Sequence, residues 1–178
     1  MESAKSYWNN RYDGGGTSGY GSYNEQLEKK LNWITPLDYK TITEVGCGDF
    51  NFGMHLLARH PARYLGLDIS DVVIKKNREL YDGIPFAIMR HDVPSGDLLM
   101  CVDVLFHILD DRDYANTLIA LKNAWTKYLV ITAYEYEQTE GIYPHVVIRK
   151  FDPSYFGTPL IREVIEEDGQ LMFYIFKR

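Results

Sequence analysis

Residues 44–49 read Glu-Val-Gly-Cys-Gly-Asp, and they continue directly from the run Thr-Ile-Thr-Glu-Val at 41–45. The run predicts a buried strand. Gly46 and Gly48 predict a tight turn at its carboxyl end, because glycine adopts backbone conformations that other residues avoid. In an open α/β sheet, such a loop lies where ligands bind, and the next helix offers them its unpaired N–H groups. The stretch therefore predicts a ligand-binding turn.

Patterns typical of strands and helices alternate along the rest of the chain. Strands are predicted at 41–45, 64–69, 86–90, 98–106 and 128–134, and helices at 23–34, 52–60 and 71–81 and from Asp110 or Asp111 onward. Two further strand-like runs flank Asp168-Gly169, a hairpin turn signal. The fold class is therefore α/β: a doubly wound, Rossmann-like sheet of seven strands, mostly parallel, with an antiparallel C-terminal hairpin.

Length and composition narrow the class of protein. The chain has 178 residues and a net charge of −6. This length suits a single domain at 23–178, preceded by a glycine- and aromatic-rich segment at 1–22 that is expected to be mobile while its large aromatics pack on the domain. No apolar run is long enough for a membrane span, and no signal peptide is apparent. Two cysteines favour a reducing cytoplasm. The acidic balance argues against nucleic acid as a partner, and no His/Cys spacing indicates a metal site.

Two acids follow the next two predicted strands. Asp68 ends the second strand and could accept both hydroxyls of a ribose, because a carboxylate has two acceptor oxygens. Asp92 follows the third strand and could accept from an adenine amino group. Together with the glycine turn, these acids fit an adenosine-containing ligand. The alternatives are a helix-capping acid at Asp68 and an ordinary turn residue at Asp92.

The chemistry of the turn separates the possible adenosine ligands. A dinucleotide site favours the pattern G-x-G-x-x-G, but the run here is Gly46-Cys47-Gly48-Asp49-Phe50-Asn51, so the third glycine is missing. Glu44 and Asp49 would repel a pyrophosphate and attract a cation. S-adenosylmethionine, which carries a sulfonium and an ammonium, is therefore favoured. A NAD(P)-dependent oxidoreductase on a related sheet is the alternative.

The motifs in this order resemble those of the class I S-adenosylmethionine-dependent methyltransferases, in particular small single-domain bacterial and phage types. The resemblance covers nearly the whole chain. It rests on EVGCGDF, GLDIS, HDV and CVDVLFHIL, with HVVIRKF as a further similar segment. It implies binding of S-adenosyl-L-methionine, with S-adenosyl-L-homocysteine as product. The implied cofactor contacts in the domain are Glu44, Gly46, Cys47, Gly48, Asp68, Ile69, Asp92, Val93 and Asp103. One departure is that residues 135–157 lack the pattern of the usual long helix.

The N-terminal segment YWNNRYDGGGTSGYGS is similar to a lid that closes over the cofactor in some of these enzymes. Arg11 could pair with the methionine carboxylate. Trp8 and Tyr20, with Tyr7, could cover the sulfonium by cation–π contact. The alternative is a disordered tail.

His107 is the first candidate for a catalytic base, since it follows the predicted fourth strand and histidine takes protons near neutral pH. His145, in the loop after the fifth strand, is the second. The expected reaction is methylation of an oxygen or nitrogen of a small metabolite or sugar. The alternatives are a packed histidine at 107, a solvent-facing one at 145, and a non-catalytic S-adenosylmethionine-binding partner protein. The sequence does not indicate an oligomeric state.

Overall fold

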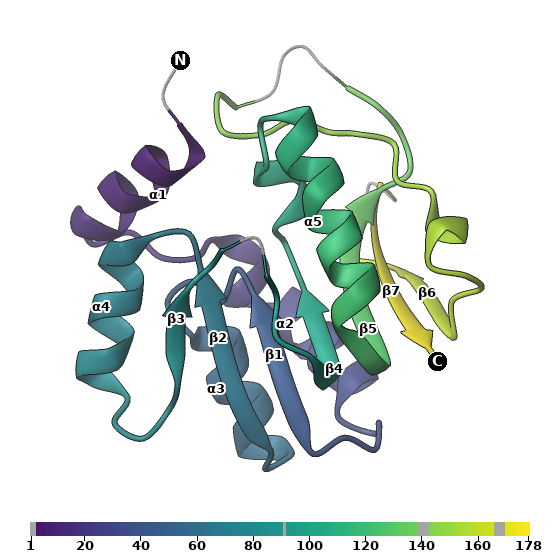
Figure 1. Cartoon of the computed structure of the whole chain (residues 1–178), viewed down its shortest axis with the longest axis horizontal. Coiled ribbons are helices and arrows are strands. Elements are labelled where there is room, and N and C mark those ends of the chain that lie inside the picture. Colours follow the sequence, from purple (N-terminus) through teal and green to yellow (C-terminus); the bar gives the residue numbers. More distant parts are fainter. Residues whose placement is uncertain (1–2, 91, 139–142, 166–169) are drawn as a thin grey trace.

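The computed structural model describes residues 3–90, 92–138, 143–165 and 170–178. Its seven-stranded sheet has the order β3-β2-β1-β4-β5-β7-β6 (Figure 1). The strands are β1 (Thr41–Val45), β2 (Arg63–Asp68), β3 (Phe86–Ile88), β4 (Gly96–Cys101), β5 (Trp125–Tyr134), β6 (Ile161–Val164) and β7 (Leu171–Lys177). The first five run parallel, and β7 pairs antiparallel with both β5 and β6. This confirms the predicted fold class and the antiparallel end; the predicted Asp168-Gly169 turn lies outside the described residues.

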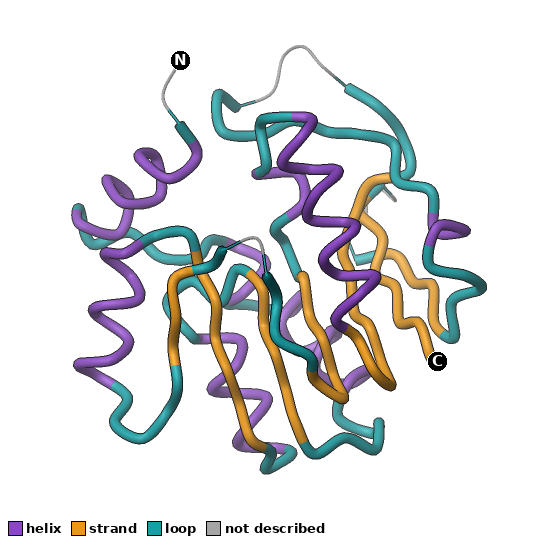
Figure 2. Tube along the Cα trace, in the orientation of Figure 1, coloured by secondary structure: helices purple, strands orange, loops and turns teal. Residues whose placement is uncertain are grey.

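Helices pack on both faces of the sheet. The α-helices are α1 (Ala4–Asp13), α2 (Glu25–Ile34), α3 (Asn51–Arg59), α4 (Asp71–Leu80) and α5 (Asp111–Ala124), and short 3-10 helices are η1 (Tyr20–Ser22), η2 (Leu105–His107) and η3 (Pro153–Tyr155). One half of the core joins α2, α3 and α4 to the sheet, and the other half lies under α5. In Figures 1 and 2, α5 crosses in front of β4 and β5. Within the described part of 135–157 the structure has no α-helix, in agreement with the missing helical pattern.

The fourth strand is shorter than expected. Its residues 98–101 are 0% exposed, as suits a central parallel strand. It ends at Cys101 because Asp103 takes a left-handed backbone (φ 57°), with its N–H donated to Thr132 Oγ1 at 2.6 Å. The prediction that this strand continues to Phe106 is therefore wrong, since Leu105–His107 form the single turn η2 instead.

The N-terminal segment differs most from expectation. Residues predicted to be mobile form α1, which is capped by Ser3. Asn9 fixes α1 to the start of α4, donating to Asp71 Oδ1 and accepting from Ser70 Oγ, both at 2.7 Å. Tyr12 is buried, as expected of an aromatic that packs on the domain, but Tyr20 is 67% exposed, so its predicted packing is wrong.

Candidate functional site

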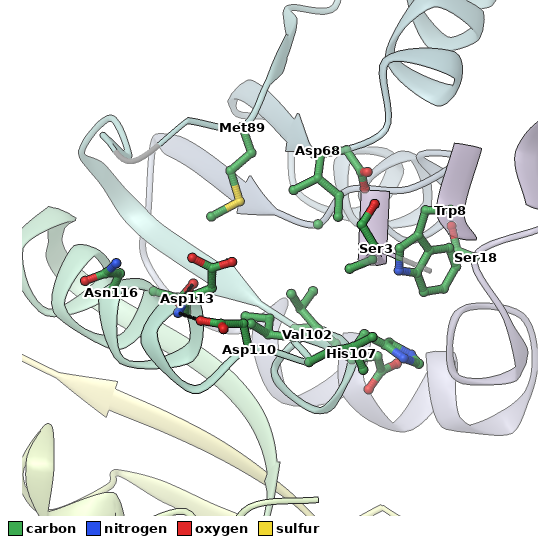
Figure 3. A pocket seen from close by; sticks show the side chains of 18 of the residues that line it. Ser3, Trp8, Ser18, Asp68, Met89, Val102, His107, Asp110, Asp113 and Asn116 are labelled. Atoms are coloured by element: carbon green, nitrogen blue, oxygen red, sulfur yellow. Dashed lines mark hydrogen bonds between the residues drawn. The ribbon is translucent and has the colours of Figure 1, made fainter. Parts of the chain in front are cut away.

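A pocket of about 670 Å³ opens at the carboxyl ends of β1, β2 and β4 (Figure 3). Its walls come from the turn after β1, the ends of β2 and β3, the segment between β4 and α5, one face of α5, and the N-terminal segment. The lining residues are Ser3, Ala4, Trp8, Tyr12, Ser18, Ser22, Gly46, Asp68, Ile69, Met89, Arg90, 102–104, 107–110, Asp113, Asn116, Thr117 and Ala120. Figure 3 shows Met89 and Asp68 facing Val102, His107 and Asp113 across the space.

The glycine turn has the predicted form. Gly46 and Gly48 both have positive φ, 76° and 50°. The N–H groups of Gly46 and Cys47 donate to the Leu67 carbonyl at 2.7 and 2.9 Å, which joins the turn to β2. Gly46 lines the pocket, and a Cβ there would collide with Val104. Bare backbone therefore forms this wall, whereas Cys47 is buried beneath it and is not part of the lining.

Asp68 is a carboxylate in the pocket wall. It is 7% exposed, and its two oxygens accept the N–H groups of Gly48 and Ser70 at 3.0 and 2.8 Å. Burial raises its pKa to about 6. The Ile69 N–H also bonds this carboxylate, and the acceptor capacity that remains on its two oxygens can serve a ligand. Ile69 follows it in the lining, while Ser70 caps α4 as predicted.

The other two acids of the turn do not face the pocket. Asp49 accepts from the Ser18 N–H at 2.9 Å, the Ser18 hydroxyl at 2.7 Å and the Tyr23 hydroxyl at 2.5 Å. Glu44 is buried behind the turn and accepts from the Tyr64 hydroxyl. Burial raises the pKa of Glu44 to about 8, so it is mostly protonated at neutral pH. The expectation that both acids present negative charge to a ligand is therefore wrong.

Glu44 should make stability fall with rising pH. Its folded pKa of about 8 lies above its ordinary 4.5, so between these values the folded chain holds a proton that the unfolded chain has released. As the pH rises from about 6.5 to 8, the free energy of unfolding of the wild type should fall by about 1–2 kcal/mol relative to that of Glu44→Gln. That window lies above the ranges in which Asp68 and His107 contribute. Urea unfolding at several pH values measures this difference in the free energy of unfolding, and Glu163→Gln, at an exposed position, is the control. If the free energies of unfolding of the wild type and Glu44→Gln change in parallel with pH, the prediction is contradicted.

Asp103 lines the pocket, but its charge is already balanced. Its carboxylate pairs with Lys30, whose side chain is 0% exposed and also donates to the Gly21 carbonyl at 3.1 Å. Thr132 Oγ1 donates to the second oxygen at 3.0 Å. A buried lysine requires such a partner, because an unpaired buried charge is costly. Lys30 was not predicted to belong to the site, although a cation on the apolar stripe of α2, between Leu27 and Ile34, was a signal in the sequence.

Two predicted cofactor contacts, Asp92 and Val93, lie outside the pocket lining. Asp92 is exposed and Val93 is half-buried, and neither lines the pocket. The preceding residues Met89 and Arg90 line it instead. The adenine contact assigned to Asp92 stays a prediction.

The N-terminal segment contributes a wall that the sequence analysis anticipated only in part. Trp8 lines the pocket, as do Tyr12, Ser18 and Ser22, which were not singled out. Arg11 does not line it; its guanidinium donates to the Thr17 carbonyl at 2.6 Å and lies 5.6 Å from the centre of the Trp8 ring. Tyr20 also lies outside the lining.

The two histidine candidates lie together. His107 lines the pocket, and its Nδ1 lies 3.0 Å from the backbone carbonyl of His145. A carbonyl only accepts, so this contact places the proton of the neutral ring on Nδ1 and leaves Nε2 with a free lone pair. Burial lowers the pKa of His107 to about 4, which keeps the ring neutral. The His145 ring lies outside the pocket and stacks on Tyr7, with 4.2 Å between centroids.

One face of α5 completes the site. Asp110, Asp113, Asn116, Thr117 and Ala120 recur at helical spacing along the wall. Asp110 also caps the helix, accepting from the N–H groups of Arg112 and Asp113 at 2.9 and 3.0 Å. The sequence analysis recognised this helix but not its polar face, because the apolar stripe on its other side dominates the pattern.

Two further observations concern the described residues as a whole. None of their helices has the length and hydropathy that crossing a membrane requires. Nor do they bring together three or more His, Cys, Asp or Glu side chains in an arrangement able to hold a metal ion.

Comparison with known proteins identifies solved structures that share this fold. No protein-family model and no curated protein matches the sequence. Among solved structures, magnesium protoporphyrin IX methyltransferase from Synechocystis PCC 6803, with bound S-adenosylmethionine, is similar at TM-score 0.71 and 15% identity, over 100% of this chain and 98% of that one. An N-methyltransferase from Bradyrhizobium japonicum, in complex with S-adenosyl-L-homocysteine, is similar at TM-score 0.65 and 14% identity, over 86% of each chain.

A third similar structure is an O-methyltransferase family protein from Burkholderia thailandensis, at TM-score 0.63 and 14% identity over 86% of this chain. This chain covers 56% of the length of that protein. At such identities the likeness concerns the fold: the chain has the fold of the class I S-adenosylmethionine-dependent methyltransferases.

Proposed function

We propose that the protein is an S-adenosylmethionine-dependent methyltransferase that acts on an oxygen or nitrogen atom of a small metabolite or sugar. One observation carries the proposal: the glycine turn after β1 and the pocket-facing Asp68 at the end of β2 meet in one pocket of about 670 Å³. They do so on a sheet whose fold is shared with methyltransferases that contain S-adenosylmethionine or its product.

The residues present fit the adenosine part of this cofactor. Asp68 retains acceptor capacity toward the pocket besides accepting the N–H groups of Gly48, Ile69 and Ser70, which suits a ribose hydroxyl. Ile69 and Met89 supply apolar surface beside it, and Gly46 permits close approach of a ligand to the backbone. When bound, the cofactor would supply an electrophilic methyl group on a sulfonium.

The remainder of the pocket supports an acceptor that loses a proton. Methyl transfer requires mainly that donor and acceptor are held in line at close contact. An oxygen or nitrogen nucleophile also releases a proton, and the neutral His107 has an unprotonated Nε2 to receive it. Asp103 cannot add net charge here, since Lys30 neutralises it. His107 is therefore the candidate base.

The N-terminal segment would act as the lid of this site. Ser18, and Tyr23 just beyond the segment, bind Asp49 of the turn. Ser18 also lies so close to Gly48 that a Cβ on Gly48 would collide with the Ser18 side chain. Trp8 and Tyr12 lie over the pocket. Closure by such a segment would exclude water from the reaction.

Removing the Asp49 carboxylate should open this lid. Asp49→Ala removes the acceptor of two hydroxyl groups and one N–H group, and hydrogen bonds to a charged group contribute about 1.5–3 kcal/mol each. Loss of even one such bond corresponds to a factor of about 10, so we expect trypsin to cleave after Lys5 and Arg11 at least about 10-fold faster than in the wild type, and the cofactor to dissociate faster. Asp82→Ala, an exposed carboxylate after α4, is the control. Equal cleavage rates for Asp49→Ala and the wild type would show that these bonds do not hold the lid.

Both cysteines, Cys47 and Cys101, are buried free thiols. This supports the proposal that the protein works in a reducing compartment such as the cytoplasm.

The test of the function is turnover. Purified protein is incubated with methyl-labelled S-adenosylmethionine and fractionated small-molecule extracts, and release of S-adenosylhomocysteine is followed. The proposal expects one class of fraction to drive release and to gain the labelled methyl group on oxygen or nitrogen. Tight cofactor binding without release in any fraction, with a protein partner retained on the column, would favour a non-catalytic role.

A further inference from the structure

Residues 143–149, in the connection after β5, lie against η2 and the link that leads from it to α5. The Val147 N–H donates to the Phe106 carbonyl at 2.8 Å. The His145 carbonyl faces Nδ1 of His107 at 3.0 Å. Two contacts from this segment therefore bind adjacent residues of one short turn.

Arg149 makes a third and stronger attachment. Its guanidinium donates through Nη1 to the Ile108 carbonyl at 2.6 Å and through Nη2 to the Leu109 carbonyl at 2.9 Å. Nε donates to Asp111 Oδ1 at 2.9 Å, and the group lies 4.8 Å from the centre of the Tyr114 ring. The side chain is 14% exposed, so water competes little for these donors. The guanidinium is planar, rigid and always charged, so its several N–H groups can bind three acceptors at the same time.

The contacts of Arg149 are important for η2 because this short turn has few stabilising interactions of its own. It spans three residues and has no side-chain cap. Short 3-10 turns have poor hydrogen-bond geometry. His107 is its last residue, and Ile108 and Leu109, which Arg149 holds, follow directly and line the same pocket. The orientation of the His107 ring therefore depends on groups outside its own turn.

We propose that Arg149 is a positioning residue for His107: by fixing the carbonyls of Ile108 and Leu109, it keeps the His107 Nδ1–H on the His145 carbonyl and Nε2 unprotonated. The catalytic value of this arrangement rests on the proposed function, but the arrangement itself exists without a cofactor or acceptor. Arg149 need not touch the acceptor, since it acts through the backbone.

The experiment is nitrogen NMR of protein labelled with ¹⁵N-histidine, recorded for the wild type, Arg149→Met and Arg149→Lys. The wild type should show His107 as a single tautomer with the proton on Nδ1. In Arg149→Met, the ring should become a tautomer mixture, and its pKa should rise from about 4 toward its ordinary 6.5 as water enters. Arg149→Lys should show an intermediate change, because an ammonium lacks the planar fork. Arg162→Met, an exposed arginine on β6 paired with Glu135, is the matched control.

An unchanged His107 tautomer and titration in folded Arg149→Met would overturn the proposal. If that variant does not fold, Arg149→Lys decides in the same way, since it keeps the charge. Titration of each variant with S-adenosylmethionine separates the positioning role of Arg149 from the proposed function. If Arg149 only positions the base, the affinity of each variant for the cofactor should stay within about threefold of that of the wild type. A wild type that shows the Nδ1-protonated tautomer but binds no S-adenosylmethionine would overturn the proposed function and leave the positioning role standing.

Discussion

Replacing His107 with alanine is expected to lower turnover by about 10²- to 10⁴-fold while changing cofactor affinity little, because proton removal by a placed base contributes on that scale. His107 lines the pocket with its proton held on Nδ1 by the His145 carbonyl, so Nε2 carries the lone pair that would take a proton from the acceptor. Its pKa of about 4 keeps this nitrogen unprotonated across neutral pH but also makes it a weak base, so the loss should lie toward the lower end of that range. Single-turnover rates and calorimetric affinities, measured on the same preparation, check both parts.

A second histidine provides a matched control. His60 also places a ring nitrogen on a backbone carbonyl, that of Tyr39 at 2.9 Å, but it does not line the pocket. His60→Ala should leave the catalytic rate unchanged even if it costs stability. Unchanged turnover in His107→Ala with the true acceptor would contradict the assignment of the base, and a large loss of cofactor affinity would instead indicate a binding role.

Replacing Asp68 with alanine is expected to weaken S-adenosylmethionine binding by about 100-fold or more, because two hydrogen bonds to a charged acceptor are lost at about 1.5–3 kcal/mol each. The substitution also frees the N–H groups of Gly48 and Ser70, which loosens the turn and costs stability. Isothermal titration calorimetry measures the affinity. Asp68→Asn, which keeps the shape and one acceptor oxygen, should fall between alanine and wild type.

Asp97 gives the matched control for this carboxylate. It accepts the Lys40 N–H at 2.9 Å at the start of β4, on the opposite edge of the sheet from the pocket. Asp97→Ala should lower stability without changing affinity. In the wild type, affinity should also fall as pH drops through about 6, because Asp68 then takes up a proton. An affinity that is independent of Asp68 and of this pH range would contradict the ribose assignment.

Much of the fold follows from local patterns in the sequence. The alternation of apolar runs and helical stripes located β1 to β5 and the helices between them, because parallel strands are buried on both faces and their helices on one. Glycine or acidic residues at the carboxyl ends of the strands indicated that the pocket lies at those ends. The antiparallel end was readable from its two short apolar runs.

The errors have physical causes as well. The helix α1 is held by tertiary contacts, such as those of Asn9 with Ser70 and Asp71, rather than by an apolar stripe of its own. The protonated state of Glu44 depends on burial by residues far away in sequence. The pairing of Lys30 with Asp103 joins positions 73 residues apart. Contacts of this kind are fixed by the folded packing, and local periodicity does not report them.

The most direct test of the central claim is calorimetric titration of the wild-type protein with S-adenosylmethionine, S-adenosylhomocysteine and NADH. We expect a dissociation constant of about 10 μM or tighter for the first two ligands, with no comparable binding of NADH. Absence of binding to both S-adenosyl ligands, or a preference for NADH, would contradict it. Either result would mean that the turn at Gly46 and Gly48 serves a different ligand.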